Sequence, residues 1–160
     1  MAMDSTVLIR IRHPHIDPDA LTRAFGIEPE HSWRAGEAKP GSETIRRESY
    51  WVAQASLSPR FSFPQGLGGE VGSGSEETWT PTYLDQTPLE RALTMAALPF
   101  MVNWKFWSGL RDEGATAQLI VVLGGPSLPG FELSHEVIAM LSRLGISLSV
   151  EFRDIAEAAA

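Results

Sequence analysis

The sequence contains no cysteine, and this absence excludes a group of functions. Without a thiol there is no cysteine nucleophile, disulfide framework, zinc ribbon or iron–sulfur cluster. Long apolar segments are also lacking, because the longest run, residues 95–102, contains Pro99 and is too short to cross a bilayer. Since the N-terminus also has no signal-peptide pattern, we expect a cytoplasmic protein without a membrane segment.

Basic residues are outnumbered by acidic ones, 13 to 20, which gives a formal net charge of −7 at pH 7. Nucleic-acid binding gains most of its affinity from phosphate neutralisation by basic side chains, so we expect no nucleic-acid partner. The acidic excess lies in residues 61–160, because residues 1–60 hold eight basic and eight acidic side chains. We expect this second part to suit a basic or neutral protein partner.

Recognisable catalytic motifs are also missing. The GxSxG elbow of serine hydrolases does not occur, and the glycines at 66–74 lack both GxGxxG spacing and a following lysine. The neighbouring carboxylates of Asp112 and Glu113 are expected to point apart in a turn as solvated charges, unlike a glycosidase pair. We therefore predict no catalytic residues and no cofactor.

His13, His15 and Asp17 are spaced like the start of the metal sites of amidohydrolases and metallo-β-lactamases. Both families need more ligands than this chain supplies, and Asp17 is already explained as the N-cap of a helix. We interpret the two histidines as the solvated end of a strand and predict no metal site.

The 160 residues, with 43% hydrophobic and 21% charged side chains, are typical of one globular domain. We predict a single domain over 1–160, with a glycine-rich loop insertion near 58–80. Alternating apolar residues predict strands, and capping signals with helical periodicity predict helices. The strands are expected over 6–12, 49–57, 115–123 and 146–152, and the helices over 18–25, from Thr87 to near Gly114 with an interruption or restart at Pro99, and from Ser134 to Leu144.

Both ends of the chain show the same order: a strand, a loop, a capped helix and then a Gly-Ile pair, at residues 26–27 and 145–146. Such units usually form a sheet with helices on one face. We therefore predict an α+β fold, with a mainly antiparallel sheet and helices packed on one face, ferredoxin-like or built from duplicated β-α units.

A set of short sequence features is spread over nearly the whole chain. They are the N-terminal strand with Asp17, Pro18 and Leu21, the run 26–29, Trp33 with Gly36, the strand bearing Trp51, Leu98 with Pro99, and the run 144–146. With these features the sequence resembles the bacterial domain-of-unknown-function family 4279. Residues 64–75 depart from the family pattern as an insertion. The resemblance implies a fold and no reaction.

A polar turn-rich stretch, residues 32–48, joins two elements and contains an aromatic residue among basic ones. Aromatic residues and arginine dominate binding hot spots. The alternative, also open, is that Trp33 packs onto the core and the arginines are only solvated. We take this stretch and the following strand as the candidate surface for a partner or an anion, formed by Trp33, Arg34, Arg46, Arg47 and Trp51.

Two functional hypotheses follow. The first is a non-catalytic binding or protein-interaction module, for example an immunity-type protein that masks a partner. The second is a protein that binds a small anionic ligand, or a minor enzyme, through Trp33 and the arginines. We favour the first because of the size, the charge and the absence of a reactive motif.

Overall fold

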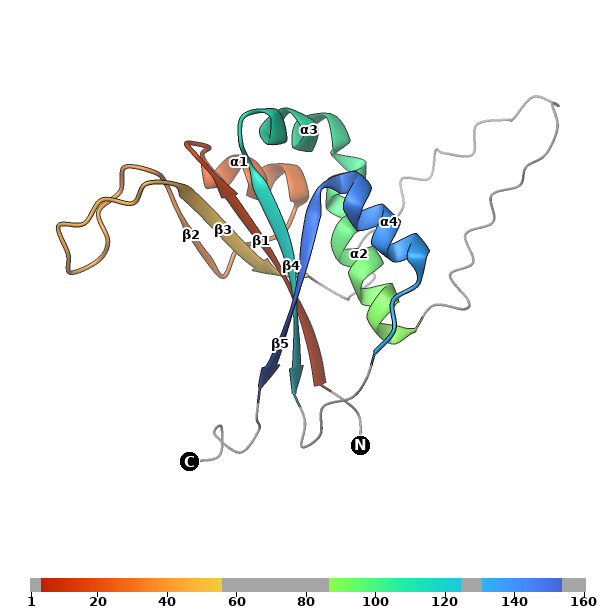
Figure 1. Ribbon diagram of the computed structural model, residues 1–160. Helices are drawn as coiled ribbons and strands as arrows, with labels where there is room; N and C mark the ends of the chain where they lie inside the picture. Colours follow the sequence, from red (N-terminus) through yellow and green to blue (C-terminus); the bar gives the residue numbers. More distant parts are fainter. Residues whose placement is uncertain (1–3, 56–86, 125–130, 154–160) are drawn as a thin grey trace, which may run out of the picture.

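The computed structural model describes residues 4–55, 87–124 and 131–153 and forms one sheet with helices against it (Figure 1). The described residues contain five strands and four helices. In chain order these are β1 (Asp4–His13), α1 (Pro18–Phe25), β2 (His31–Trp33), β3 (Ser49–Gln54), α2 (Pro88–Val102), α3 (Trp104–Asp112), β4 (Thr116–Gly124), α4 (His135–Leu144) and β5 (Ile146–Arg153).

The sheet has the strand order β2-β3-β1-β4-β5. The pairs β2–β3, β3–β1 and β1–β4 are antiparallel, while β5 runs parallel to β4 and is connected to it through α4. Without β5, and taken from the β4 side, the strands lie in the order β4-β1-β3-β2. This is the ferredoxin-like arrangement of two split β-α-β units. The predicted α+β class and its mainly antiparallel sheet are confirmed. Strand β5 adds a fifth, parallel strand beside β4.

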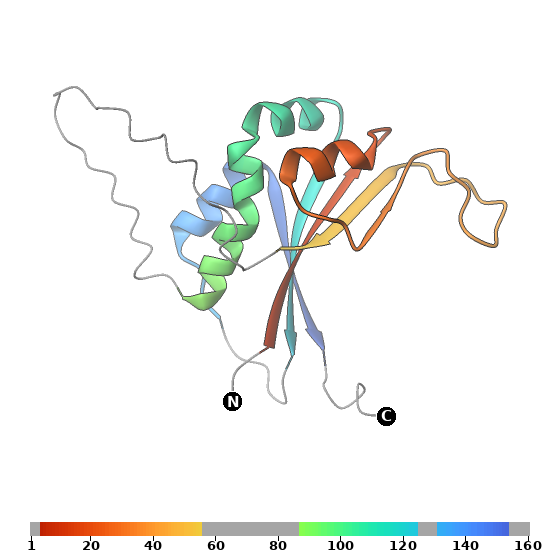
Figure 2. The same ribbon diagram turned by 180° about the vertical axis from the view of Figure 1, so that it is seen from behind.

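The helices lie on one face of the sheet, and the hydrophobic core lies between them (Figures 1 and 2). Alternation along each strand decides which side chains enter this core. In β1, Val7, Ile9 and Ile11 are buried in it, as the sequence predicted. The side chains between them, including Arg10, point to the opposite face, which we call the open face.

Two glycines end helices in the predicted way. Gly26 after α1 and Gly145 after α4 have φ values of 66° and 67°, in the left-handed region that an L side chain rarely adopts. The repeated Gly-Ile pair nevertheless has two outcomes: Ile146 begins β5, whereas Ile27 lies before β2 without belonging to a strand. The two units share the preceding strand, the helix and its glycine cap, and they differ after the Gly-Ile pair.

The predicted interruption at Pro99 is displaced by four residues. Helix α2 continues through Pro99 to Val102, and the chain leaves helical geometry at Asn103 before α3 begins. Asn103 donates from both its backbone nitrogen and its Nδ2 to the carbonyl oxygen of Pro99, at 3.1 and 2.9 Å. The side-chain amide therefore binds a helical carbonyl at the point where the helix ends.

Glu90 connects the start of α2 to the start of α4. Its Oε1 accepts a hydrogen bond from the Ser134 backbone nitrogen at 2.7 Å, and its Oε2 accepts one from the Thr87 nitrogen at 3.0 Å. The Thr87 side chain in turn accepts from the Glu90 nitrogen, which completes the predicted capping box. These bonds, that from Ser134 foremost, lower the pKa of Glu90 from 4.5 to about 2.

We expect Glu90→Gln to lower the melting temperature by several degrees at pH 7, because an amide places a donor where the carboxylate accepts. A carboxyl whose pKa is lowered by folding stabilises the fold at pH values above its pKa in the unfolded chain. For Glu90 this contribution is lost as the pH falls from about 4.5 toward 2. The difference between the variant and wild type should therefore shrink over this range in thermal unfolding. Glu132→Gln, at an exposed position, is the control; an equal loss for both variants would contradict this role.

The predicted glycine-rich loop, 58–80, lies outside the described residues, as do residues 56 and 57 of the predicted second strand.

Candidate functional site

The open face of the sheet carries both polar and apolar side chains. Val52, Ile120 and Val122 are buried there although they are not part of the core under the helices. Cross-strand pairing places Arg10 between Val52 of β3 and Gln118 of β4. Arginine can cover apolar neighbours with its aliphatic stem and keep its guanidinium at the surface. This face therefore combines an apolar floor with basic groups.

An aromatic stack, which we define as Trp33, Tyr50 and Arg46, lies at the β2 edge of the open face. Trp33 and Tyr50 pair across β2 and β3, and their rings are parallel within 11° with centroids 4.1 Å apart. The guanidinium carbon of Arg46 lies 4.1 Å from the centroid of the Trp33 ring. Stacking and cation–π contacts hold all three side chains in place and leave them partly exposed.

A shallow groove of about 320 Å³ lies beside the aromatic stack. The two are adjacent because Tyr50 pairs with Arg12 of β1 in the sheet. We call it the arginine groove, and its lining residues are Arg10, Arg12, Thr116, Ala117, Gln118 and Ser147.

The sequence-predicted surface is only partly assembled. Trp33 and Arg46 come together, but Arg34 turns toward α1 and donates to Asp17 from both Nε and Nη2, at 3.1 and 2.8 Å, and to Asp19 at 3.0 Å. The backbone bond from Asp19 and then Arg34 hold the pKa of Asp17 below its usual value, and the Asp17 carboxylate raises that of Arg34. Arg34 therefore joins the β2 region to the N-cap of α1. Arg47 is exposed.

Trp51 belongs to the core, which corrects its assignment to the binding surface. It has no exposed surface, its Nε1 donates to Thr22 Oγ1 of α1 at 3.1 Å, and it packs edge-on against Phe25. The physical reason is alternation: Trp51 pairs with Ile11 and shares its face of the sheet, whereas Tyr50 points the other way.

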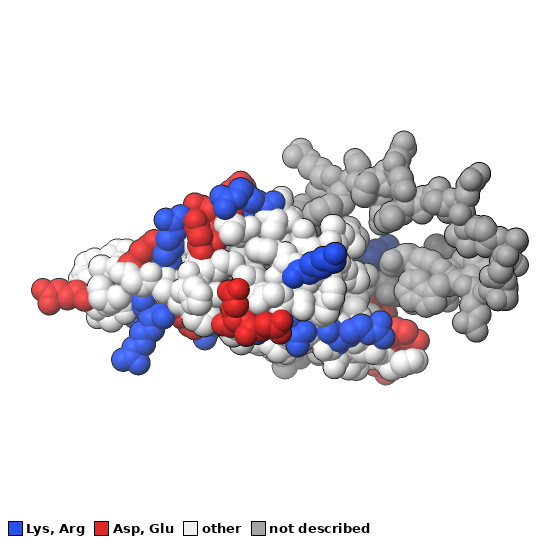
Figure 3. All heavy atoms as spheres, turned by 90° about the horizontal axis from the view of Figure 1, so that it is seen from above, with Lys and Arg blue, Asp and Glu red and all other residues white. Residues whose placement is uncertain are grey.

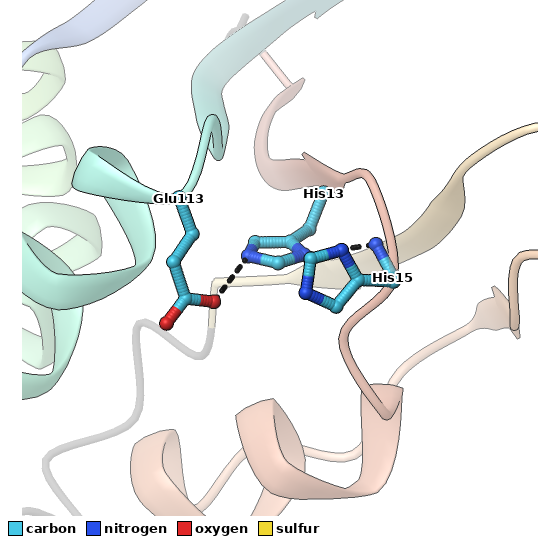
Figure 4. Close-up of side chains that lie close together, drawn as sticks. All are labelled: His13, His15 and Glu113. Carbon is cyan, nitrogen blue, oxygen red and sulfur yellow. Dashed lines mark hydrogen bonds and ion pairs between the residues drawn. The ribbon is translucent and has the colours of Figure 1, made fainter.

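His13 is not a solvated strand end, contrary to the expectation from sequence. Its side chain is 1% exposed, and its Nδ1 accepts hydrogen bonds from the backbone nitrogens of His15 and Ile16, at 3.0 and 2.9 Å. Its Nε2 lies 3.2 Å from the Glu113 carboxylate (Figure 4). Glu113, which was expected from the sequence to be a solvated charge, therefore has a partner. Burial, followed by the nearby His15, lowers the pKa of His13, while Glu113 acts in the opposite direction.

His13, His15 and Glu113 lie within 4.8 Å of one another, close enough for a shared metal ion. The hydrogen bonds of His13 do not fit that role. A histidine ligand usually binds the metal through one nitrogen and donates a proton from the other. The Nδ1 of His13 accepts two backbone donors, so its neutral ring carries the proton on Nε2, the nitrogen that faces Glu113. The arrangement is that of a structural histidine which closes the turn after β1.

Acidic and basic side chains are interleaved over the end of the molecule where α1, α3 and the β2–β3 connection lie (Figure 3). The Asp17–Arg34 pair is one example of this pairing. A mixed distribution of this kind gives no strong field of one sign for attracting a polyanion.

Comparison with known proteins finds a family match for part of the chain. The model of the family described as a domain of unknown function (DUF4279) matches residues 3–65, which confirms the resemblance seen in the sequence over these residues. This segment holds β1 to β3 and with them Trp33, Tyr50, Arg46, Arg10 and Arg12. No curated protein and no solved structure matches the chain. In the described part of the chain, no helix has the length and apolar character needed to cross a membrane.

Proposed function

Because the family matched by residues 3–65, DUF4279, has no described function, we propose one from the structure. The protein is a non-catalytic binding module that recognises a protein partner through the open face of its sheet. The observation that carries the proposal is the aromatic stack at the β2 edge. Trp33, Tyr50 and Arg46 are the residue types that dominate binding hot spots, and here they are held in one arrangement before any partner arrives.

The position of the stack supports this role. The helices pack on the other face of the sheet, so the stack does not contribute to the core. A tryptophan and a tyrosine that are fixed by stacking offer a large contact area and lose little conformational entropy on binding. An aromatic residue that only stabilises the fold removes more apolar surface from water when it lies in the core, as Trp51 does.

The titratable groups of the described residues support a binding role over catalysis. His13, His15 and Glu113 form the one close cluster of metal-ligand type found among them. His13 already uses Nδ1 for backbone hydrogen bonds, so its other nitrogen, the Nε2 that faces Glu113, carries the proton in the neutral ring and is not a general base.

We expect Trp33→Ala and Arg46→Ala each to weaken partner binding by about 1–4 kcal/mol, because each removes a member of the stack. The measurement is affinity capture from the native host with wild type, both variants and Arg23→Ala, followed by titration of the captured partner. Arg23 is exposed on α1 and is the matched control for the loss of an arginine. Each variant is first checked for native circular dichroism. If all four proteins retain the same partners with equal affinity, the stack is not the binding site.

A further inference from the structure

Arg10 is fixed in the middle of the sheet in an orientation that leaves part of its guanidinium without an acceptor. It lies on β1, and its Nη1 donates to Gln118 Oε1 on β4 at 3.0 Å. Its Nε is shielded from solvent and has no hydrogen-bond partner among the described residues. An unpaired buried donor costs free energy, which an incoming acceptor would recover.

The unpaired atom belongs to the side of a guanidinium that binds oxyanions. Nε and Nη2 donate in parallel, and a carboxylate or phosphate can accept from both. Arg34 of the same chain uses this edge of its guanidinium, since its Nε and Nη2 both donate to Oδ1 of Asp17. Arg10 lines the arginine groove, and the Nε of its equivalent edge has no acceptor among the described residues.

A second guanidinium lines the same groove. Arg12 follows Arg10 on the same face of β1 and pairs with Glu48 at 3.6 Å, in a contact whose two side chains are about half exposed. Such a surface pair is weak and exchanges readily. The groove lining contains two arginines, two hydroxyl side chains and an amide, and none of its residues is acidic.

We propose that the arginine groove binds an oxyanion, a carboxylate or phosphate group, between Arg10 and Arg12. The volume of about 320 Å³ fits a small anion or an acidic group carried by a larger molecule. Gln118 holds Arg10 in place, and Arg12 supplies the second charge after leaving Glu48. This site is separate from the aromatic stack and does not depend on the stack binding a protein.

The test is a titration that is monitored through the side-chain Nε–H resonances of the arginines in nitrogen-15 NMR. Inorganic phosphate and succinate are the two probes, and sodium chloride at matched ionic strength is the control for screening. We expect a saturating shift of the Arg10 resonance with at least one of the two probes and none with chloride. Saturation by phosphate alone assigns the site to phosphate groups, and by succinate alone to carboxylates.

Variants show whether the groove is responsible. Arg12→Gln is expected to weaken the response of Arg10 roughly ten-fold, since it removes one charged donor. Arg10→Lys removes the Arg10 resonance, so this variant is followed through the Nε–H resonance of Arg12, whose response should be lost with the bidentate geometry. Arg23→Lys, at an exposed position of α1, should leave the titration unchanged. If Arg10→Lys fails to fold, Arg12→Gln alone decides. A shift that does not saturate, or one that persists unchanged in Arg12→Gln, would overturn the proposal. Trp33→Ala should leave the titration unchanged, so failure here is distinct from failure of the stack to bind a partner.

Discussion

Trp51→Ala is expected to lower the free energy of unfolding by about 3–5 kcal/mol, the usual cost of truncating a fully buried tryptophan. Trp51 has no exposed surface and packs edge-on against Phe25 under α1. The substitution also leaves Thr22 without the indole donor that reaches it at 3.1 Å. Urea unfolding followed by circular dichroism measures the loss.

Trp33→Ala provides the matched control, because it removes the same side chain from the open face. Its ring contacts Tyr50 and Arg46 and is partly exposed, so its removal should cost about 1 kcal/mol. The two variants should thus separate a core tryptophan from a surface one. Equal losses of stability would show that Trp33 is structural and would remove the main support for the proposed binding surface.

His13→Ala is expected to destabilise the protein by about 1–3 kcal/mol, because two part-buried backbone donors lose their acceptor. The two donors are the nitrogens of His15 and Ile16, which both reach His13 Nδ1. An asparagine at this position places its Oδ1 where a turn of this kind accepts such donors. His13→Asn should therefore recover much of the stability lost in His13→Ala.

The same residue makes stability depend on pH. The pKa of His13 in the folded protein lies below its ordinary value of 6.5, chiefly because of burial, so the unfolded chain takes up the proton first. Stability is therefore expected to fall as the pH drops below 6.5 and to level off below the folded-state pKa. His13→Asn should lack this decline in thermal unfolding between pH 8 and 5. A decline of the same size in His13→Asn would assign it to other groups.

The local elements could be predicted because their causes are local. Alternation in residues 6–12 and the cap formed by Asp17 and Pro18 depend on neighbours in the chain. The capping box at Thr87 is equally local. The helix break was expected at Pro99 and falls at Asn103, whose side-chain amide binds the Pro99 carbonyl.

The candidate site was only partly visible in the sequence. Proximity along the chain suggested that Arg34 and Trp51 belong with Trp33, but neighbouring residues of a strand point to opposite faces. The same alternation placed Arg10 and Arg12 together on one face of the first strand, and this was the available signal for the arginine groove. What it lacked was the partner strand, since Gln118 and Ser147 come from more than 100 residues further along the chain.

The strand β2 (His31–Trp33) was not predicted from the sequence. The sequence by itself determined the helices, the other four described strands, the α+β class, the absence of thiol chemistry and the family resemblance over the first three strands. Each of these follows from composition or from contacts between near neighbours. Only the tertiary structure decided that Trp51 is core, that His13 is buried against Glu113, and that the aromatic stack and the arginine groove adjoin. These outcomes depend on which strands pair and which face the helices cover, and both are set by contacts between residues far apart in the chain.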